Sequence, residues 1–136
     1  MGCAVTPVVS PTHYGDIATG YAEDVVAGRI VSSKYHRLAC QRHIDDIARA
    51  EMGGWSYAWN PEITDHEGRA FRPAERICKF VQLLPHIKGD WAARRQRIAL
   101  EPVQIFILAS IFGWTHTETG KRRFRVVDLF VPRKNA

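Results

Sequence analysis

Residues 126–131 read Val126-Val127-Asp128-Leu129-Phe130-Val131, and this stretch decides the fold class. Its apolar character is nearly continuous, with Asp128 as the one interruption. A strand of this kind is normally buried on both faces, as in a parallel or mixed central sheet. Upstream, residues 113–117 and 123–131 are rich in β-branched and aromatic residues and flank Thr119-Gly120. The sequence therefore predicts a β-hairpin that leads into a buried strand.

The strand runs into Pro132-Arg133-Lys134-Asn135. A P-loop consists of a strand, a turn of the form G-x-x-x-x-G-K-[ST] and a helix, and its backbone N–H groups hold phosphates. Here the strand and the middle of such a loop are present, whereas the Gly-Lys-Ser/Thr and the helix are not in the sequence. The pair Gly120-Lys121 is not the Gly-Lys of a P-loop, because it precedes the strand and is followed by Arg122 instead of Ser or Thr. It is expected to be part of a turn.

Helical periodicity dominates the chain before residue 113. Ser32 or Ser33 can cap the second of the expected helices, and Pro73 and Pro102 are good first-turn residues for the last two. The last helix is apolar on nearly all sides, which predicts that it is buried. Four helices are expected, at about residues 16–28, 33–52, 73–85 and 102–112.

The predicted fold is therefore mainly α, with a β-hairpin and strand at the C-terminal end. Residues 1–14 contain Pro, Thr and Ser and are expected to form a flexible leader. Residues 53–70 combine turn-forming residues with Trp55, Tyr57 and Trp59, and we expect these rings to pin an irregular loop to the helices.

The positive net charge of the chain is compatible with a nucleic acid, an acidic protein or an anionic ligand as a partner, and it does not distinguish among them. The chain has 136 residues, the size of one ordinary domain, and a net charge of +5. Two alternatives stay open for Lys121, Arg122, Arg123 and Arg125: contact with DNA or an adjacent subunit, or a solvated hairpin edge. Residues 88–97 form a second basic segment, a linker around Trp91, and the pair Asp45-Asp46 is expected to be solvated.

The number of cysteines and the hydropathy of the chain argue against a disulfide-rich protein, a zinc protein and a membrane-spanning protein. Three cysteines do not make a disulfide framework, and Cys40 with His43 is at best half of a zinc site, so no metal site is predicted. No apolar run approaches the roughly 20 residues of a membrane span. We expect a cytoplasmic protein with reduced thiols and no membrane contact.

A set of short motifs follows the order of the predicted elements. Their order and spacing, from about Tyr14 to Asn135, resemble the N-terminal part of phage large terminases of the HK97 type, the ATP-driven DNA-packaging subunits. The motifs are Tyr21-Ala22-Glu23-Asp24-Val25-Val26, Arg37-Leu38-Ala39-Cys40-Gln41-Arg42-His43, Glu75-Arg76-Ile77-Cys78-Lys79-Phe80, Leu100-Glu101-Pro102-Val103-Gln104, Phe106-Ile107-Leu108, Phe112-Gly113-Trp114, Arg122-Arg123-Phe124-Arg125 and Val131-Pro132-Arg133-Lys134-Asn135.

The resemblance implies a nucleotide site. In that family a Leu-x-Pro-Trp-Gln stretch precedes the P-loop and its Gln contacts adenine, a role that falls here on Gln104. The family loop reads Val-Pro-Arg-Lys-Asn-Gly-Lys followed by Ser or Thr. Arg133 matches its early basic residue, thought to sense the γ-phosphate, and Lys134 and Asn135 match loop backbone positions. The chain departs from the family at Val103, where Trp is usual, and at Ala136, where Gly is usual.

The resemblance also implies a truncated ATPase domain of the ASCE-type P-loop α/β fold. Residues 15–136 would be its incomplete N-terminal part: a helical region 15–112, a strand segment 113–131 and a partial P-loop 131–136. The full-length family uses ATP and Mg²⁺ and works with a small terminase subunit, the portal and double-stranded DNA in the bacterial host cytoplasm. Because the loop Lys, the Walker B acid and the nuclease domain are not in this sequence, we assign no catalytic residue and expect no productive nucleotide binding.

An alternative function does not need a motor. A small standalone basic module could bind terminase partners or DNA through its basic end. The two hypotheses differ in what they predict for DNA binding, which should be salt-sensitive if the chain is a DNA-binding module.

Overall fold

The computed structural model describes residues 12–131. Most of the predicted leader lies outside the described residues, and so do Arg133, Lys134 and Asn135 of the predicted phosphate loop. Within residues 12–131 the helices are α1 (Tyr14–Val26), α2 (Lys34–Met52), α3 (Pro73–Leu83), α4 (Gly89–Ala93) and α5 (Pro102–Phe112). The strands are β1 (Tyr57–Trp59), β2 (Ile63–Thr64), β3 (Ala70–Phe71) and β4 (Trp114–His116), so the predicted mainly α character is confirmed.

Local capping explains where three helices begin. The Ser33 hydroxyl accepts a hydrogen bond from His36 N at 3.2 Å and caps α2, as predicted. Gly53 ends α2 at a φ of +82°, in the left-handed region that favours glycine. Pro73 and Pro102 occupy the first turns of α3 and α5, where a missing N–H costs nothing.

A long-range cap explains why α1 begins at Tyr14, two residues before the predicted Asp16. The Glu75 carboxylate accepts hydrogen bonds from Tyr14 N at 3.0 Å and from Gly15 N at 2.8 Å. In turn, Asn60 Oδ1 accepts from Ala74 N at 3.0 Å and caps α3. Two side chains distant in sequence therefore satisfy free N–H groups at the starts of α1 and α3.

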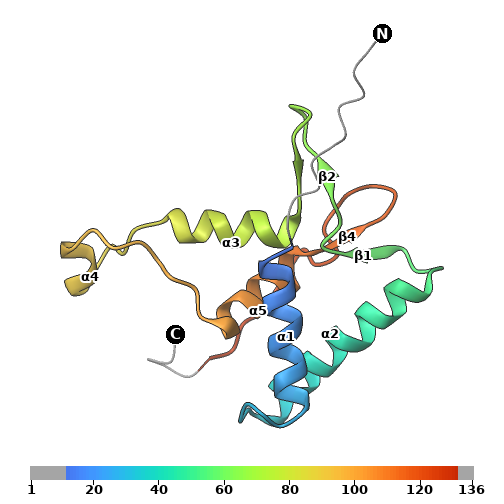
Figure 1. Cartoon of the computed structure of the whole chain (residues 1–136), viewed down its shortest axis with the longest axis horizontal. Helices are drawn as coiled ribbons and strands as arrows, with labels where there is room; N and C mark the ends of the chain where they lie inside the picture. Colours follow the sequence, from blue (N-terminus) through green and yellow to red (C-terminus); the bar gives the residue numbers. More distant parts are fainter. Residues whose placement is uncertain (1–11, 132–136) are drawn as a thin grey trace.

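The core lies between α1, α2, α3 and α5, with α1 packed against both α2 and α5 (Figure 1). Its small residues let the helix axes approach closely. The prediction that α5 is buried holds for one face only, because Val103 is exposed and Ile107 is half-buried. The buried core residues are Ala18, Ala22, Val25, Cys40, Ala74, Cys78, Ile105, Phe106 and Ala109.

Two short antiparallel sheets replace the irregular loop predicted for residues 53–70. β1 pairs with β4, so that Trp59 lies opposite Trp114, and β2 pairs with β3. Strands of two or three residues are too short to show an alternating pattern, which is why the sequence did not reveal them. The expectation that the aromatic rings pin this region to the helices is confirmed, since the Trp59 ring lies 4.4 Å from the His43 ring of α2.

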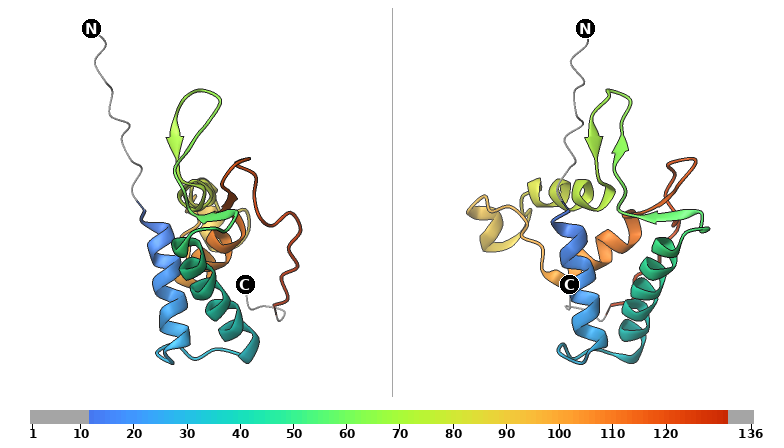
Figure 2. Two further views of the ribbon diagram at one scale, coloured as in Figure 1. Left: turned by 90° about the vertical axis from the view of Figure 1, so that its right-hand side faces the viewer. Right: turned by 45° about the vertical axis from the view of Figure 1, so that its right-hand side comes forward.

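The predicted C-terminal hairpin forms only near its turn. Gly120 has a φ of +69°, and Thr115 pairs with Arg122 beyond the turn. The predicted buried strand at residues 126–131 is wrong for this structure, because those residues form no strand and Phe130 is 93% exposed. No strand within residues 12–131 pairs with them, so their backbone N–H and C=O groups have no sheet partner there. The segment runs along the side of the molecule opposite α1 (Figure 2).

Candidate functional site

A cleft of about 810 Å³ lies between α2, α5 and residues 124–131. It exists because the outward face of α5 is covered by no other helix of residues 12–131, and the extended segment crosses in front of that face. The walls are mostly apolar, which is typical of small-molecule sites that fix orientation with a few polar groups. The polar residues among its lining are His36, Arg42, His43, Asp46, Gln104 and Ser110.

Gln104 lies in the first turn of α5 and lines this cleft. Its Oε1 accepts a hydrogen bond from Glu101 N at 2.9 Å, which is half of a capping box and fixes the side chain over the helix start. The side-chain NH₂ remains as the donor that can meet a ligand. Val131, which directly precedes the predicted phosphate loop, lines the same cleft. Gln104 and Val131, the first residue of the predicted partial P-loop 131–136, therefore line one cleft.

His43 forms part of the cleft and is 3% exposed. Its ring packs edge-on against Trp59, Phe106 and Trp114. Burial lowers the pKa of His43 to about 4, an effect that Asp46 opposes and Arg42 reinforces. The imidazole is therefore neutral at pH 7, with one ring nitrogen as a donor and the other as an acceptor.

Two cleft-lining residues carry buried polar atoms without a partner. His43 Nδ1 and Ser110 Oγ form no hydrogen bond to any of the residues 12–131, while His43 Nε2 lies 3.5 Å from Thr19 Oγ1. Buried polar atoms are nearly always hydrogen-bonded, so such atoms mark places where a water molecule or a ligand can complete the bonding. No sequence pattern indicates this role of His43, which follows from its burial beside the three aromatic rings.

The basic cluster divides into one structural arginine and three surface cations. Arg123 Nη1 lies 2.8 Å from Asp46 Oδ2 of α2, with the two side chains 20% and 14% exposed. Its guanidinium also lies 4.8 Å from the ring centroids of Trp55 and Phe124. These contacts join the start of the extended segment to α2, which gives Arg123 a structural role in the fold. The expectation that Asp46 is solvated is wrong for the same reason.

The other members of the cluster remain on the surface. Lys121, Arg122 and Arg125 are exposed, and the Arg122 guanidinium lies 5.0 Å from the centroid of the Phe112 ring. Asp45 is exposed as expected and accepts a hydrogen bond from Gln41 of the same helix.

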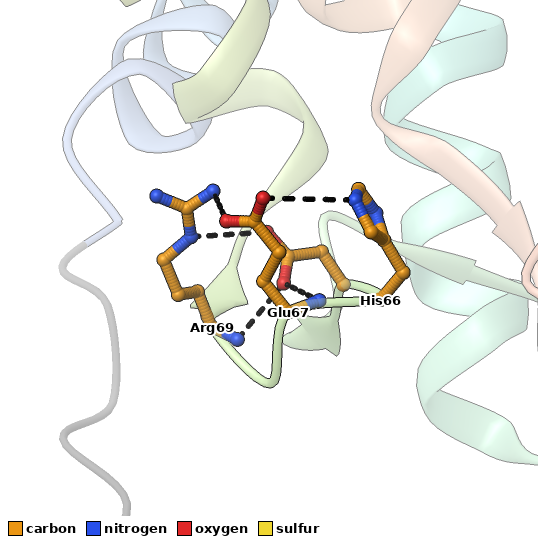
Figure 3. Close-up of polar contacts among 4 residues, drawn as sticks. His66, Glu67 and Arg69 are labelled. Carbon is orange, nitrogen blue, oxygen red and sulfur yellow. Dashed lines mark hydrogen bonds and ion pairs between the residues drawn. The ribbon is translucent and has the colours of Figure 1, made fainter.

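The β2–β3 turn holds a cluster of charged groups that is explained by its own geometry. The Asp65 carboxylate accepts hydrogen bonds from Glu67 N and Arg69 N, both at 2.9 Å, and these bonds lower the pKa of Asp65. Figure 3 shows Glu67 between Arg69 and His66: Glu67 forms an ion pair with Arg69, and its Oε1 lies 3.7 Å from His66 Nε2. The turn is exposed and its polar groups bond to one another, so it offers no chemistry beyond fixing the hairpin.

Cys40 and Cys78, the cysteines among residues 12–131, do not assemble a metal site. Cys40 and Cys78 are buried, and burial raises the pKa of each thiol to about 11. Cys40 Sγ lies 3.9 Å from His36 Nε2, but this pair supplies only two of the four ligands that a structural zinc site uses. Within residues 12–131, no group of three or more His, Cys, Asp or Glu side chains could hold a metal, and no helix is long and apolar enough to cross a membrane.

No protein-family model, no curated protein and no solved structure matches this chain. Its function must therefore be inferred from the order of its motifs and from the cleft.

Proposed function

We propose that this chain is the N-terminal part of a phage large terminase of the HK97 type, the ATP-driven motor subunit that packages viral DNA. One observation carries the proposal: Gln104 and Val131 line a single cleft of about 810 Å³. A nucleotide site needs a group that reads the base next to a loop that holds the phosphates. Residues 104 and 131–135 are the positions at which the motif order places these two parts.

The chemistry of the cleft fits one face of a nucleotide. Val103 and Ile107 supply an apolar wall on which a flat base can pack, and the Gln104 amide offers a donor to its edge. The buried polar atoms of His43 and Ser110 add unmet hydrogen-bonding capacity to the same wall. A purine fits such a surface because it combines two apolar faces with a polar rim.

The exposed apolar segment supports the same assignment. In a P-loop ATPase of the ASCE type, the residues before the phosphate loop form a strand of a central sheet. Val126 and Phe130 are 82% and 93% exposed, and Val127, Leu129 and Val131 of the same segment are exposed too. A run of exposed apolar side chains of this kind marks a surface that another part of a protein covers. Sheet partners supplied by the remainder of an ATPase domain would cover them.

The proposed function includes no catalysis by residues 1–136 alone. In the proposed motor, the lysine that stabilises phosphoryl transfer would come from the loop after residue 135, so the residues of the cleft are assigned binding and no catalytic step. In the complete motor the partners would be the small terminase subunit, the portal and double-stranded DNA.

The DNA sequence that follows codon 136 tests this proposal. We expect it to encode Gly-Lys-Ser or Gly-Lys-Thr within a few codons, in the same or another reading frame, followed by an amphipathic helix. A continuation that encodes no such motif in any frame would remove the motor assignment, whatever the cleft binds.

A further inference from the structure

A second cavity, of about 310 Å³, lies between α3, the β2–β3 hairpin and the turn that follows β4. It shares no lining residue with the cleft that contains Gln104. Side chains alternate between the two faces of β4, so that Trp114 lines the cleft and Thr115, the next residue, lines the cavity. The β2–β3 hairpin leads directly into α3 and forms one side of the cavity (Figure 1). Its volume lies at the lower end of the range for small-molecule sites.

The lining of this cavity is mostly apolar. Four of its residues, at positions 73, 76, 77 and 80, follow the spacing i, i+3, i+4 and i+7, which places them on one face of α3. A lining of this kind covers an apolar body, whereas a small hydrated ion would gain little from it. The apolar side chains are Ile63, Phe71, Pro73, Ile77, Phe80 and Phe112.

Two arginines from different elements line the same cavity, and each lies over an aromatic ring. The Arg76 guanidinium of α3 is 4.4 Å from the centroid of the Phe71 ring. The Arg122 guanidinium, beyond the turn after β4, is 5.0 Å from the centroid of the Phe112 ring. A guanidinium that packs on a ring through its face keeps the N–H groups at its edge for other partners.

The charges of these two arginines are not neutralised within the fold. Neither Arg76 nor Arg122 forms an ion pair with any of residues 12–131, and no acidic residue of that range lines the cavity. The planar fork of a guanidinium matches a carboxylate, with which it can form two parallel hydrogen bonds. Thr115 is 3% exposed, and its hydroxyl has no hydrogen-bond partner among the same residues. The cavity therefore combines an apolar lining with free donors for an anion.

We propose that this cavity binds a small carboxylate with an aromatic or branched aliphatic body, of about the size of 3-phenylpropanoate. The body lies against the apolar lining, and the carboxylate binds the edges of Arg76 and Arg122. A phosphate of a nucleic acid would leave the apolar lining uncovered, so the combination favours an organic acid. This inference goes beyond the proposed motor function, because it concerns a separate cavity and does not depend on the residues that follow Ala136.

Titration of the whole chain with 3-phenylpropanoate, followed by two-dimensional amide NMR, tests the ligand class and its location together. We expect a Kd on the order of 1 mM at pH 7, as the size of this ligand allows. The amide signals of Ile77, Thr115 and Gly120 should shift, and that of Gln104 should not. Two related compounds serve as controls: 3-phenylpropanamide lacks the charge and propanoate lacks the ring. Each should bind at least about tenfold more weakly.

Substitution of the two arginines tests their role. Arg76→Gln/Arg122→Gln should weaken the binding of 3-phenylpropanoate at least about tenfold and leave the binding of 3-phenylpropanamide nearly unchanged. The matched control is Lys34→Gln/Arg37→Gln, which removes two exposed cations from the first turn of α2 and should leave both affinities unchanged. Melting curves by circular dichroism show whether the variants fold. The comparison of carboxylate and amide on the wild type needs no variant and decides the question even if the arginine variant unfolds.

Four results would overturn the proposal. They are equal affinities of the wild type for the carboxylate and the amide, equal losses in the two double variants, shifts at Gln104 without shifts at Thr115, and no shift at Thr115 or Gly120 at about ten times the expected Kd. Any of them leaves the motor assignment to the test on the coding DNA.

Discussion

Arg123 is expected to stabilise the fold rather than to bind a ligand, and Arg123→Ala tests this directly. The substitution leaves the Asp46 carboxylate, which is 14% exposed, without its cation. Removing one partner of a fully buried ion pair costs about 3–5 kcal/mol, and the partial exposure of this pair reduces the expected cost to about 2 kcal/mol. Loss of the guanidinium contacts with the Trp55 and Phe124 rings adds about 0.5–1 kcal/mol.

The free energy of unfolding should therefore fall by about 3 kcal/mol at pH 7, measured by urea denaturation with circular dichroism. For a chain of this size, that loss corresponds to a fall of roughly 10 °C in the melting temperature. The control is Arg125→Ala, two residues along, whose exposed side chain should change stability by less than about 0.5 kcal/mol.

A double-mutant cycle isolates the ion pair. Asp46→Asn in the Arg123→Ala background should cost clearly less than Asp46→Asn alone, because the carboxylate no longer has a partner to lose. If Arg123→Ala and Arg125→Ala had the same small effect, the pair with Asp46 would not form in solution. Arg123 would then return to the set of cations that are free to meet DNA.

Three further substitutions test other parts of the structure. Gly15→Ala should destabilise the protein by about 1–3 kcal/mol, because its Cβ would lie 2.5 Å from Asn60 Nδ2. Gly20→Ala, in open space on the same helix, should instead stabilise it by about 0.5–1 kcal/mol. Equal effects of the two substitutions in urea denaturation would refute this packing. Glu75→Ala should cost about 2–4 kcal/mol through two lost backbone hydrogen bonds, and a melting temperature equal to that of the wild type would show that the cap does not form. The pKa of His43 is about 4 in the folded protein, against 6.5 for a solvated histidine in the unfolded chain. The stabilising contribution of the neutral His43 ring should therefore be fully present above pH 6.5 and should decrease as the pH falls toward 4, so that the free energy of unfolding is lower by about 2 kcal/mol at pH 5. An unchanged pH slope in His43→Gln would contradict this.

Local rules account for what the sequence revealed correctly. Ser33 caps α2, and Pro73 and Pro102 start α3 and α5, because the free N–H groups of a helix start favour these residue types within one turn. The same reasoning placed the turn at Gly120, which has the positive φ that glycine adopts easily.

Long-range contacts account for what the sequence did not reveal. The cap of Glu75 on α1 and the ion pair of Asp46 with Arg123 join residues that are distant in the chain, so no local pattern could indicate them. Asp46 has the sequence context of an ordinary surface carboxylate on a helix, and only the fold places an arginine beside it.

The largest difference between the fold predicted from the sequence and the structure concerns residues 126–131. Apolar continuity correctly indicates residues that favour a strand, but a strand forms only where a second backbone offers hydrogen bonds. Within residues 12–131 no such partner lies beside this segment, which therefore remains extended and exposed. The residue pattern of a segment indicates that it favours a strand, but it does not show whether a neighbouring strand is present to pair with it.

Base selectivity tests the central claim, that Gln104 reads a nucleotide base beside the phosphate loop, most directly. Where the coding sequence continues into Gly-Lys-Ser or Gly-Lys-Thr, the longer polypeptide should be titrated with ATP and GTP. The proteins compared are the wild type, Gln104→Ala and Gln96→Ala, a control at an exposed glutamine between α4 and α5. Loss of the amide contact should reduce the preference for ATP over GTP about tenfold in Gln104→Ala and leave it unchanged in Gln96→Ala. An ATP preference that is the same in all three proteins would show that the cleft beside Gln104 is not the base site.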